Sequence, residues 1–517
     1  MQHDGVAAPR GLWKIILASS AGTLIEWYDF FVFGSLATII AGQFFPKGND
    51  TAALLSTLAT FATGFLVRPF GAAFFGKMGD VLGRKHTFLL TLLMMGGATV
   101  AIGLVPNYAT IGAFAPALLV LFRLIQGLAL GGEYGGATTY VAEHAPANRQ
   151  GFYTSFIQIT STLGLFVSLI VVLVTRTALT EPVFASWGWR IPFLLSAVLI
   201  LFSYLVRRRL DESPMFAELK KAGKLSKNPL VESFTNRENR VKVLIALFGA
   251  TAGQAVVFYT SQFYTLVFLT TICHIQGAAA NKIEATGLIL GAPFYVIFGA
   301  FSDRIGRKKL IMAGCFLAAV FYLPVFGTMK SVSTPQSPSD ALNVRVVTER
   351  RIDPETKKMT AYEITRYQDN SGAEVVIERP MSSAPGVPVD PSKKVKREII
   401  PGPKMFFLLV DLVWLLVIFA TMAYAPIAAF LVGLFPVRIR YTSLSVPYHI
   451  GNGIFGGLMP VIATAIVDKT KNDLAGLYYP IAVALMTVVI GSLFIKEKRN
   501  AEGFEEEPDL AAGSPSV

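Results

Sequence analysis

The chain has 517 residues, of which 53% are hydrophobic and 15% are charged, and its mean hydropathy is +0.53. A soluble protein of this length carries about 25% charged residues, so the composition excludes the ordinary soluble classes. The net charge of +12 does not indicate a nucleic-acid partner, because lysines and arginines gather in short loops between apolar runs. The two cysteines, Cys273 and Cys315, fall in or near such runs and predict no disulfide framework.

Apolar runs long enough to cross a bilayer as helices recur along the chain. The first run is too long for the apolar core of a signal peptide and lacks an evident cleavage site, so we expect it to remain as the first span. We expect twelve spans in two sets of six. The first set covers about 14–44, 52–77, 87–106, 112–142, 152–176 and 190–207. The second set covers about 242–272, 285–301, 308–328, 405–435, 443–467 and 477–495.

The first span carries two carboxylates, Glu26 and Asp29, inside an otherwise apolar segment. A charge at the bilayer centre costs at least about 2.5 kcal/mol. The two acids are spaced i, i+3, so they share one helix face, which also carries Gly22. We expect this face to point into the helix bundle, near Arg68 of the second span or Arg123 of the fourth.

The loop after the second span recurs after the eighth. GKMGDVLGRK at 76–85 and GAFSDRIGRK at 299–308 share the pattern G-x-x-x-D-x-x-G-R-K, with 223 residues between the two aspartates. The shared residues are Gly76, Asp80, Gly83 and Arg84 in the first copy and Gly299, Asp303, Gly306 and Arg307 in the second. Six expected spans separate the copies, so both lie on one side, and their short basic sequences predict that this side is the cytoplasm.

Each position of this repeated loop has an expected physical role. The first glycine lets two helices approach closely, and the second allows a tight turn. The aspartate suits either the N-terminus of a neighbouring helix or an ion pair with an arginine. We interpret the pair of loops as a cytoplasmic gate that opens when the halves of the protein move apart, in preference to loops that merely set orientation.

The fourth span contains Arg123, Gln126 and Glu133, and we expect neither charged residue to face lipid. A stripe of glycines four residues apart, from Gly127 to Gly135, predicts close helix packing and no further role.

Three intramembrane acids are therefore candidates for carrying a coupled proton: Glu26, Asp29 and Glu133. Removal from water favours the neutral form of a carboxyl group, so a partly paired buried acid can take up a proton on one side and release it on the other. The alternative is a static network of ion pairs that holds the N-terminal half together.

The second half is poorer in buried charge and offers mainly neutral hydrogen-bonding groups. The candidate substrate or counter-ion residues of the whole chain are Arg68, Arg123, Gln126, Tyr28, Gln254, Tyr259, Gln262 and Asn452. His449, about two turns into the eleventh expected span, suits either a proton relay or an inert hydrogen-bonded histidine, and we favour the inert interpretation.

Two connections are long. Residues 208–241 begin with Arg208 and Arg209, directly after Arg207, and they are expected to form the cytoplasmic connector between halves, with a helix from Glu212 to Lys220. Residues 330–403 contain three segments of strand-like composition, NVRVVTER, MTAYEITRYQ and AEVVIER, with DPET and DNSG expected as the turns between them. By the count of spans this insert lies on the outer face.

The repeated loop resembles the signature of the major facilitator superfamily, and FRLIQGLALGGEYGG at 122–136 looks like its fourth-span motif. IEWYDFFVFG, GGEYGG, WGWRIPFLLS, LDESPMF and APIAAFLVGLFPVRIRYTSLS together resemble the metabolite:proton symporter branch of that superfamily. This branch includes carriers of 2-oxoglutarate, citrate, shikimate and proline or betaine. The resemblance covers nearly the whole chain except 330–403, and none of these motifs names the substrate.

The resemblance implies an all-α membrane protein of twelve helices in two six-helix pseudo-repeats, with a small β-rich outer insert. The expected parts are an N-terminal half (1–207), a connector (208–241) and a C-terminal half (242–517) that contains the insert 330–403 and a short cytoplasmic tail (496–517). We expect a monomer in the bacterial inner membrane, in contact with lipid, with both termini cytoplasmic. No cofactor, metal or nucleic acid is expected.

The expected function is symport of a proton with a small polar metabolite by alternating access. An organic acid anion is the preferred substrate class, because Arg68 and Arg123 offer guanidinium groups that bind a carboxylate bidentately. A zwitterionic osmolyte is the second choice, although the short acidic tail lacks the coiled coil that osmoprotectant carriers often have. A non-transporting sensor on the same fold is a further alternative. A membrane enzyme is disfavoured, because no nucleophile–base pair, metal cluster or phosphate loop is visible in the sequence.

Overall fold

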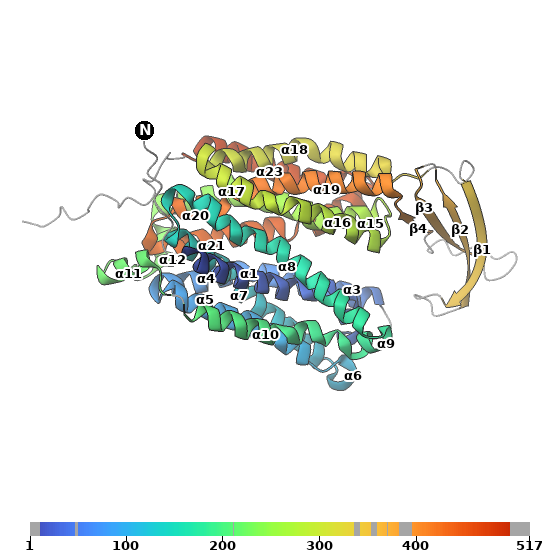
Figure 1. Ribbon diagram of the computed structural model, residues 1–517, viewed down its shortest axis with the longest axis horizontal. Helices are drawn as coiled ribbons and strands as arrows, with labels where there is room; N and C mark the ends of the chain where they lie inside the picture. The colour runs from blue at the N-terminus through green and yellow to red at the C-terminus, as the bar shows by residue number, and fades with distance from the viewer. Residues whose placement is uncertain are drawn as a thin grey trace, which may run out of the picture.

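The computed structural model describes residues 11–46, 50–209, 211–335, 342–352, 359–369, 371–381 and 395–496. Within this part of the chain, eleven helical stretches are long and apolar enough to cross a membrane. They run roughly side by side, and a small sheet projects from one end of the bundle (Figure 1). The predicted cytoplasmic tail lies almost entirely outside the described residues.

The helices divide along the chain at the connector. Those before it are α1 (Leu12–Ser35), α2 (Ala37–Phe44), α3 (Asp50–Leu66), α4 (Arg68–Val81), α5 (Arg84–Leu104), α6 (Tyr108–Ile111), α7 (Phe114–His144), η1 (Ala147–Arg149), α8 (Gln150–Ala178), α9 (Glu181–Val183), η2 (Phe184–Gly188) and α10 (Arg190–Arg207). The connector holds α11 (Pro214–Lys221) and α12 (Pro229–Thr235).

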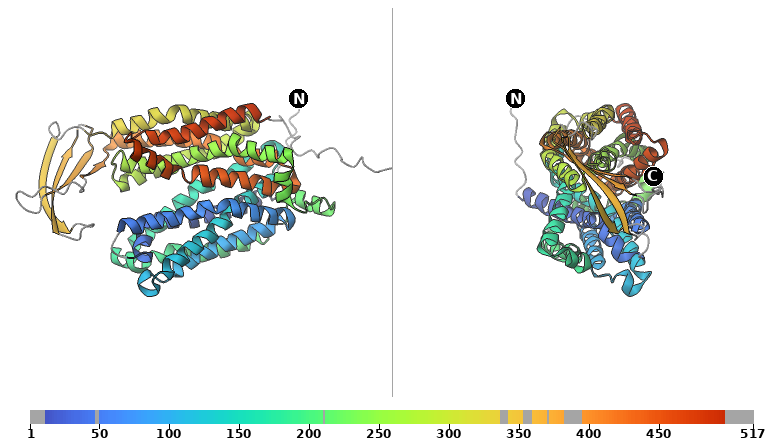
Figure 2. Two further views of the ribbon diagram at one scale, coloured as in Figure 1. Left: turned by 180° about the vertical axis from the view of Figure 1, so that it is seen from behind. Right: turned by 90° about the vertical axis from the view of Figure 1, so that its right-hand side faces the viewer.

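The helices after the connector are α13 (Arg237–Ala246), η3 (Leu247–Thr251), α14 (Ala252–Tyr259), η4 (Thr260–Tyr264), α15 (Thr265–Thr271), α16 (Gly277–Gly291), α17 (Pro293–Ile305), α18 (Arg307–Val332), α19 (Pro403–Tyr424), α20 (Ile427–Leu434), η6 (Val437–Ile439), α21 (Arg440–Ile450), η7 (Gly451–Gly456), α22 (Met459–Thr470), η8 (Ala475–Leu477) and α23 (Tyr478–Phe494). Several of them are interrupted by π-helical turns (η3, η4 and η7) or beside prolines. Figures 1 and 2 show this second group lying beside the first, with α8 and α21 near the boundary between them.

The expected second span, 52–77, is present as two helices rather than one. Pro69 stands near the start of α4 and lacks the N–H that would bond to the carbonyl of Phe65, so the helix is interrupted at Val67. The separate pieces α3 and α4 have 17 and 14 residues, and neither is among the eleven long apolar stretches. The other expected spans match helices within a few residues, apart from the eighth, which begins earlier, at Gly277.

The two ends of the bundle differ. One end, called here the motif end, carries the turns at Gly83 and Gly306, and both glycines have positive φ, 124° and 106°. Only glycine adopts such a conformation without strain, as the repeated motif predicts. The opposite end, called the insert end, carries the sheet (Figure 1).

The insert is an antiparallel sheet of four strands in the order β1-β2-β3-β4, in which β1 is Leu342–Ile352, β2 Met359–Gln368, β3 Glu374–Pro380 and β4 Lys396–Ile400. The three expected strands are confirmed, and β4 was not anticipated. Asp369 accepts hydrogen bonds from the backbone N–H groups of Ser371 and Ala373, in agreement with the turn expected at DNSG, of which Asn370 lies outside the described residues. DPET lies outside the described residues.

The sheet is attached to the second group of helices by main-chain pairing. Ile399 of β4 donates its N–H to the carbonyl of His274 at 2.8 Å and accepts the N–H of Gln276 at 2.9 Å. These residues form the connection between α15 and α16. Figure 2 shows the strands running obliquely across the insert end of the bundle.

Candidate functional site

The carboxylates of α1 and α7 meet at an arginine from α10. Arg207 Nη2 lies 2.7 Å from Glu133 Oε1, and Arg207 Nη1 lies 3.8 Å from Glu26 Oε1. All three side chains are buried, with 1% or less of each exposed. Two acids thus share one guanidinium inside the first group of helices, so the cluster has one more acid than base.

Neighbouring residues hold Arg207 in this place. Its guanidinium lies 3.5 Å from the centre of the Phe88 ring and donates to the carbonyl of Ser19. It passes through the gap that Gly22 leaves in α1, because a Cβ at that position would stand 1.9 Å from Arg207 Nη2. Thr91 donates to the second oxygen of Glu133 at 3.0 Å.

Glu26 is the least satisfied member of this cluster. Within the described residues, neither of its carboxylate oxygens has a hydrogen-bond partner, and its link to Arg207 is long. Glu133, by contrast, has both a short ion pair and a hydroxyl donor. Glu26 is therefore the acid of this cluster whose charge is least compensated by its neighbours.

Asp29 lies one turn further along α1 and has different neighbours. Ser196 of α10 donates a hydrogen bond to it, and Thr99 of α5 also faces it. Thr99 accepts a hydrogen bond from Gln126, which in turn accepts one from Arg123 at 2.8 Å. A polar relay from α1 to α7 therefore joins Asp29 to Arg123.

The prediction that Glu26 and Asp29 face the interior is confirmed, since each is 1% exposed. The predicted arginine partner is wrong for Glu26, which pairs with Arg207. From the sequence, Arg207 was the last residue of the sixth expected span and the first of three arginines that lead into the basic connector. A signal was nevertheless present, because Ser196, Ile200, Ser203 and Arg207 follow one another at steps of four, three and four residues on one buried stripe of α10.

Arg68 lies between the two groups of helices rather than beside the acids. Its guanidinium stands over Phe65 at 4.3 Å and Phe30 at 4.6 Å, and it lies beside Tyr259 of α14. Among the described residues, nothing bonds to its Nε and Nη2. These are the two neighbouring donors with which arginine grips a carboxylate side-on.

Aromatic residues from both groups of helices surround this point. Tyr134 of α7 and Tyr448 of α21 stack with their ring centres 3.5 Å apart. Tyr448 shares a hydrogen bond of 2.6 Å with the hydroxyl of Tyr424, and Gln158 of α8 donates to the hydroxyl of Tyr134. The result is a mixed aromatic and polar centre, to which both groups of helices contribute.

The remaining candidate residues lie in separate places. Tyr28 faces away from this centre and donates to the carbonyl of Pro192. Gln254 and Asn452 bond to each other across α14 and η7, and Gln262 donates to Thr162 and Tyr295. Sequence reading missed Tyr134, Gln158, Tyr424 and Tyr448, since tyrosine and glutamine in apolar helices carry no local pattern that marks them as a site.

At the motif end, the aspartate of each repeated loop caps a helix of the other group. Asp80 of α4 accepts the N–H groups of Tyr441 and Thr442 at 3.2 and 2.9 Å, at the start of α21. Asp303 of α17 accepts those of Gly151 and Phe152, both at 2.8 Å, at the start of α8. We call these arrangements the first latch and the second latch.

The first glycine of each motif makes the corresponding approach possible. A Cβ on Gly76 would stand 2.8 Å from the Cα of Thr442, and one on Gly299 would stand 2.5 Å from the Cβ of Ser155. Each aspartate is also close to the arginine of its own motif, at 3.3 Å for Asp80 and Arg84 and 3.6 Å for Asp303 and Arg307. Each aspartate therefore both caps the N-terminus of a neighbouring helix and pairs with an arginine, although these two roles were expected as alternatives.

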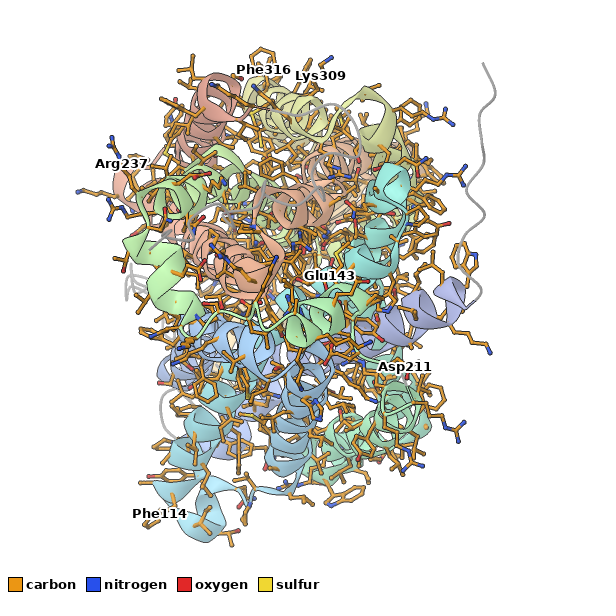
Figure 3. The ribbon with its side chains drawn as sticks, turned by 90° about the vertical axis from the view of Figure 1, so that its left-hand side faces the viewer. Phe114, Glu143, Asp211, Arg237, Lys309 and Phe316 are labelled. Atoms are coloured by element: carbon orange, nitrogen blue, oxygen red, sulfur yellow. The ribbon has the colours of Figure 1, made fainter. Side chains whose placement is uncertain are left out.

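The first latch includes further buried charges. Glu143 at the end of α7 lies 3.0 Å from Arg440 and 3.7 Å from Arg84. It also accepts a hydrogen bond from Ser213 of the connector. Figure 3 looks onto the motif end and shows Glu143 near the middle of that face, between the two groups of helices.

The sequence matches a family of known transporters. The family model described as "Sugar (and other) transporter" matches residues 14–344. The α-ketoglutarate permease of Escherichia coli is 39% identical over 63% of this chain and 74% of its own length. The citrate-proton symporter of Salmonella typhi is 28% identical over 96% of this chain and 98% of its own.

Solved structures agree with this fold. A proton:xylose symporter of the major facilitator superfamily, XylE, bound to 6-bromo-6-deoxy-D-glucose, matches 95% of this chain and 97% of its own with a TM-score of 0.68 at 15% identity. The inward-open conformation of the xylose transporter XylE from E. coli matches with a TM-score of 0.54 at 17% identity. At such low identity the likeness concerns the fold alone.

Proposed function

The chain belongs to the sugar and other transporter family of the major facilitator superfamily, and we propose that it is a symporter that imports a small organic acid anion together with a proton. Proton-coupled relatives such as the citrate-proton symporter support this proposal. The transporters of this superfamily work without an enzymatic step, so the chemistry required is the binding and release of a proton and a solute.

The observation that carries the proposal is the single arginine shared by two acids. Arg207 compensates Glu133 closely and Glu26 only weakly. The cluster therefore accommodates one proton at little electrostatic cost, and loss of that proton leaves a second negative charge competing for the same guanidinium. A change in the surroundings of this cluster as the halves rock alters the competition, and proton binding is thereby linked to the state of the carrier.

Arg68 supports the choice of an anionic substrate. It is buried between the two groups of helices, and its Nε and Nη2 have no hydrogen-bond partner among the described residues. Both donors can therefore bond to the carboxylate of a substrate. The aromatic side chains around it exclude water and favour the contact of a carbon chain. Two relatives, an α-ketoglutarate permease and a citrate-proton symporter, are named for organic acid substrates. The α-ketoglutarate permease is 39% identical over 63% of this chain.

The two latches act as the cytoplasmic gate in this proposal, and both are closed in the structure. The motif end then faces the cytoplasm, the insert end faces outward, and both termini are cytoplasmic. The chain works as a monomer in the bacterial inner membrane, with 1–207 and 242–517 as the halves that rock about the centre. The connector 208–241 joins them on the cytoplasmic side.

The test is transport into proteoliposomes with the three acids neutralised one at a time, as Glu26→Gln, Asp29→Asn and Glu133→Gln. A panel of labelled α-ketoglutarate, citrate, shikimate, proline and glycine betaine identifies the solute. Removing the coupling acid is expected to abolish accumulation driven by a proton gradient and to spare counterflow, because exchange of labelled for unlabelled solute need not release the proton. We expect the largest loss with Glu26→Gln.

A glycine pair provides a matched control. Gly22→Ala places a Cβ on the Arg207 guanidinium, whereas nothing lies within 4 Å of a Cβ on Gly97. Gly22→Ala is therefore expected to weaken proton-driven accumulation, and Gly97→Ala to leave it intact. If all three neutralised variants still concentrate solute, the cluster is structural and the proton moves elsewhere.

The same panel separates the alternatives. A zwitterionic osmolyte is the second candidate substrate, supported by a glycine betaine, proline, ectoine and pipecolic acid transporter of Dickeya dadantii that is 29% identical over 95% of this chain. Uptake of proline or betaine, and of no organic acid, assigns the chain to that class. Binding of a solute without transport of any kind would indicate a sensor.

A further inference from the structure

Two polar side chains in the centre of the molecule have donor or acceptor atoms without a hydrogen-bond partner among the described residues. Arg68 and His449 are both 2% exposed. Throughout the described ranges, Nε and Nη2 of Arg68 and both ring nitrogens of His449 are without a hydrogen-bond partner. Buried polar groups are nearly always paired, so each exception needs a physical reason such as a bound molecule. His449 is therefore not hydrogen-bonded as the inert interpretation expected, and its role stays a prediction.

The two side chains come from facing helices of the two groups. A Cβ on Gly76 of α4 would contact Thr442 of α21, and a Cβ on Gly453 would contact the carbonyl of Phe65. Phe65 belongs to α3, which precedes α4, and Gly453 belongs to η7, which follows α21. The two contacts together therefore show that α3–α4 and α21–η7 run antiparallel. Counting along both helices from these contacts places Arg68 at the level of His449, and the charge of Arg68 acts on His449.

The aromatic residues around His449 orient it without bonding to its nitrogens. Its ring is perpendicular to those of Tyr134 and Tyr448, with centre distances of 6.3 and 5.0 Å. The hydroxyls of these tyrosines are occupied, since Gln158 donates to Tyr134 and Tyr424 is bonded to Tyr448. The imidazole thus keeps one donor and one acceptor for a further molecule.

Resting on the proposed function, we propose that Arg68 and His449 bind the two ends of one substrate. Arg68 takes a carboxylate side-on through Nε and Nη2, while Tyr259 occupies another side of the guanidinium. His449 takes a second oxygen-bearing group of the same molecule. The substrate is then an acid with a carboxylate at one end and an oxygen-bearing polar group at the other. An acid with only one polar end is expected to bind more weakly.

This arrangement links substrate recognition to the closing of the carrier. Arg68 belongs to α4 and His449 to α21, which lie in different halves of the proposed rocking pair. A molecule held at both ends joins the halves, whereas a molecule held by Arg68 alone does not. Discrimination by His449 therefore affects both the affinity and the rate of translocation.

The test compares glutarate with pentanoate, two five-carbon acids that differ in having two carboxylates or one. Their binding to the purified full-length protein is measured by calorimetry, beside the variants His449→Leu, His449→Gln and Arg68→Gln. The natural protein is expected to bind glutarate about tenfold more tightly or better, the effect of one hydrogen bond to a charged group. His449→Leu removes this preference, and His449→Gln, which keeps a donor and an acceptor, retains part of it.

Controls make the result specific. Arg68→Gln is expected to weaken both acids, and His274→Leu, at the insert end, to change neither. A thermal unfolding curve checks that each variant is folded. The proposal is overturned if His449→Leu keeps the full preference for glutarate, or if the natural protein binds the two acids equally or binds neither. Proton-driven uptake of any panel solute in those cases leaves the proposed symport standing, so the two failures are distinguishable.

Discussion

The two latches are built from the same ten-residue motif, yet they differ in what surrounds them. In the first latch, Asp80 and Arg84 are 0% and 1% exposed and are joined by Glu143 and Arg440. In the second latch, Asp303 is 6% and Arg307 is 21% exposed. One latch is thus a buried cluster of charges, and the other is a partly solvated cap at a helix N-terminus.

The difference arises at two positions outside the motif. Each latch includes a stretch that follows a long helix and contains a proline, Pro146 in one half and Pro436 in the other. Three residues before the proline, the first half has Glu143 and the second half has Gly433. Four residues after the proline, the first half has Gln150 and the second half has Arg440. In the second latch, Arg307 donates to the neutral side chain of Gln150. One motif therefore gives a cluster of four charged side chains or an ion pair of two according to its neighbours.

The largest effect is expected from neutralising Glu143. In Glu143→Gln, Arg84 and Arg440 lose the carboxylate that they share, and breaking a buried ion pair on one side costs about 3–5 kcal/mol. Thermal unfolding of the purified protein measures this loss. Asp211→Asn, an exposed acid on the same face, is the control (Figure 3). The double variant Glu143→Gly with Arg440→Gln copies the second latch and should recover much of the stability.

The next effect compares the two aspartates. Asp80→Asn is expected to slow transport about tenfold or more, because an anion at a buried helix N-terminus contributes up to about 2 kcal/mol. Asp303→Asn is expected to slow it only about two- to threefold, because solvent screens the more exposed pair. Initial uptake rates in proteoliposomes, corrected for the amount of inserted protein, measure both. Equal effects would show that burial of the first latch has no functional consequence.

The smallest effect concerns Glu212, one of the connector residues that contact the first latch. This residue accepts the backbone N–H groups of Arg84 and Lys85 at 3.1 and 3.3 Å and so caps α5. Glu212→Gln is expected to cost about 1 kcal/mol, the usual value for a helix cap, and to lower the unfolding temperature slightly. Glu218→Gln, which is exposed on α11, provides the control. An unchanged unfolding temperature would place the connector outside the gate.

Composition and repetition were sufficient to predict the membrane class, the positions of the spans and the doubled gate motif. These features are local or periodic, since a span needs only a run of apolar residues and a tight turn needs only a glycine. The inward direction of Glu26 and Asp29 was also predictable, because exposing a charged helix face to lipid is energetically costly. Three of the four strands of the insert followed from their composition.

The partners of these residues were decided by the tertiary structure. Arg207 stands 181 residues after Glu26 and next to two other arginines, so only the packing of α10 against α1 distinguishes it from the connector. The open donors of Arg68 and His449 depend on the register of α4 against α21, which the span pattern does not contain. The apolar periodicity of a sequence predicts which face of a helix is buried. Which residues of two such faces meet depends on the side-chain shapes of both helices.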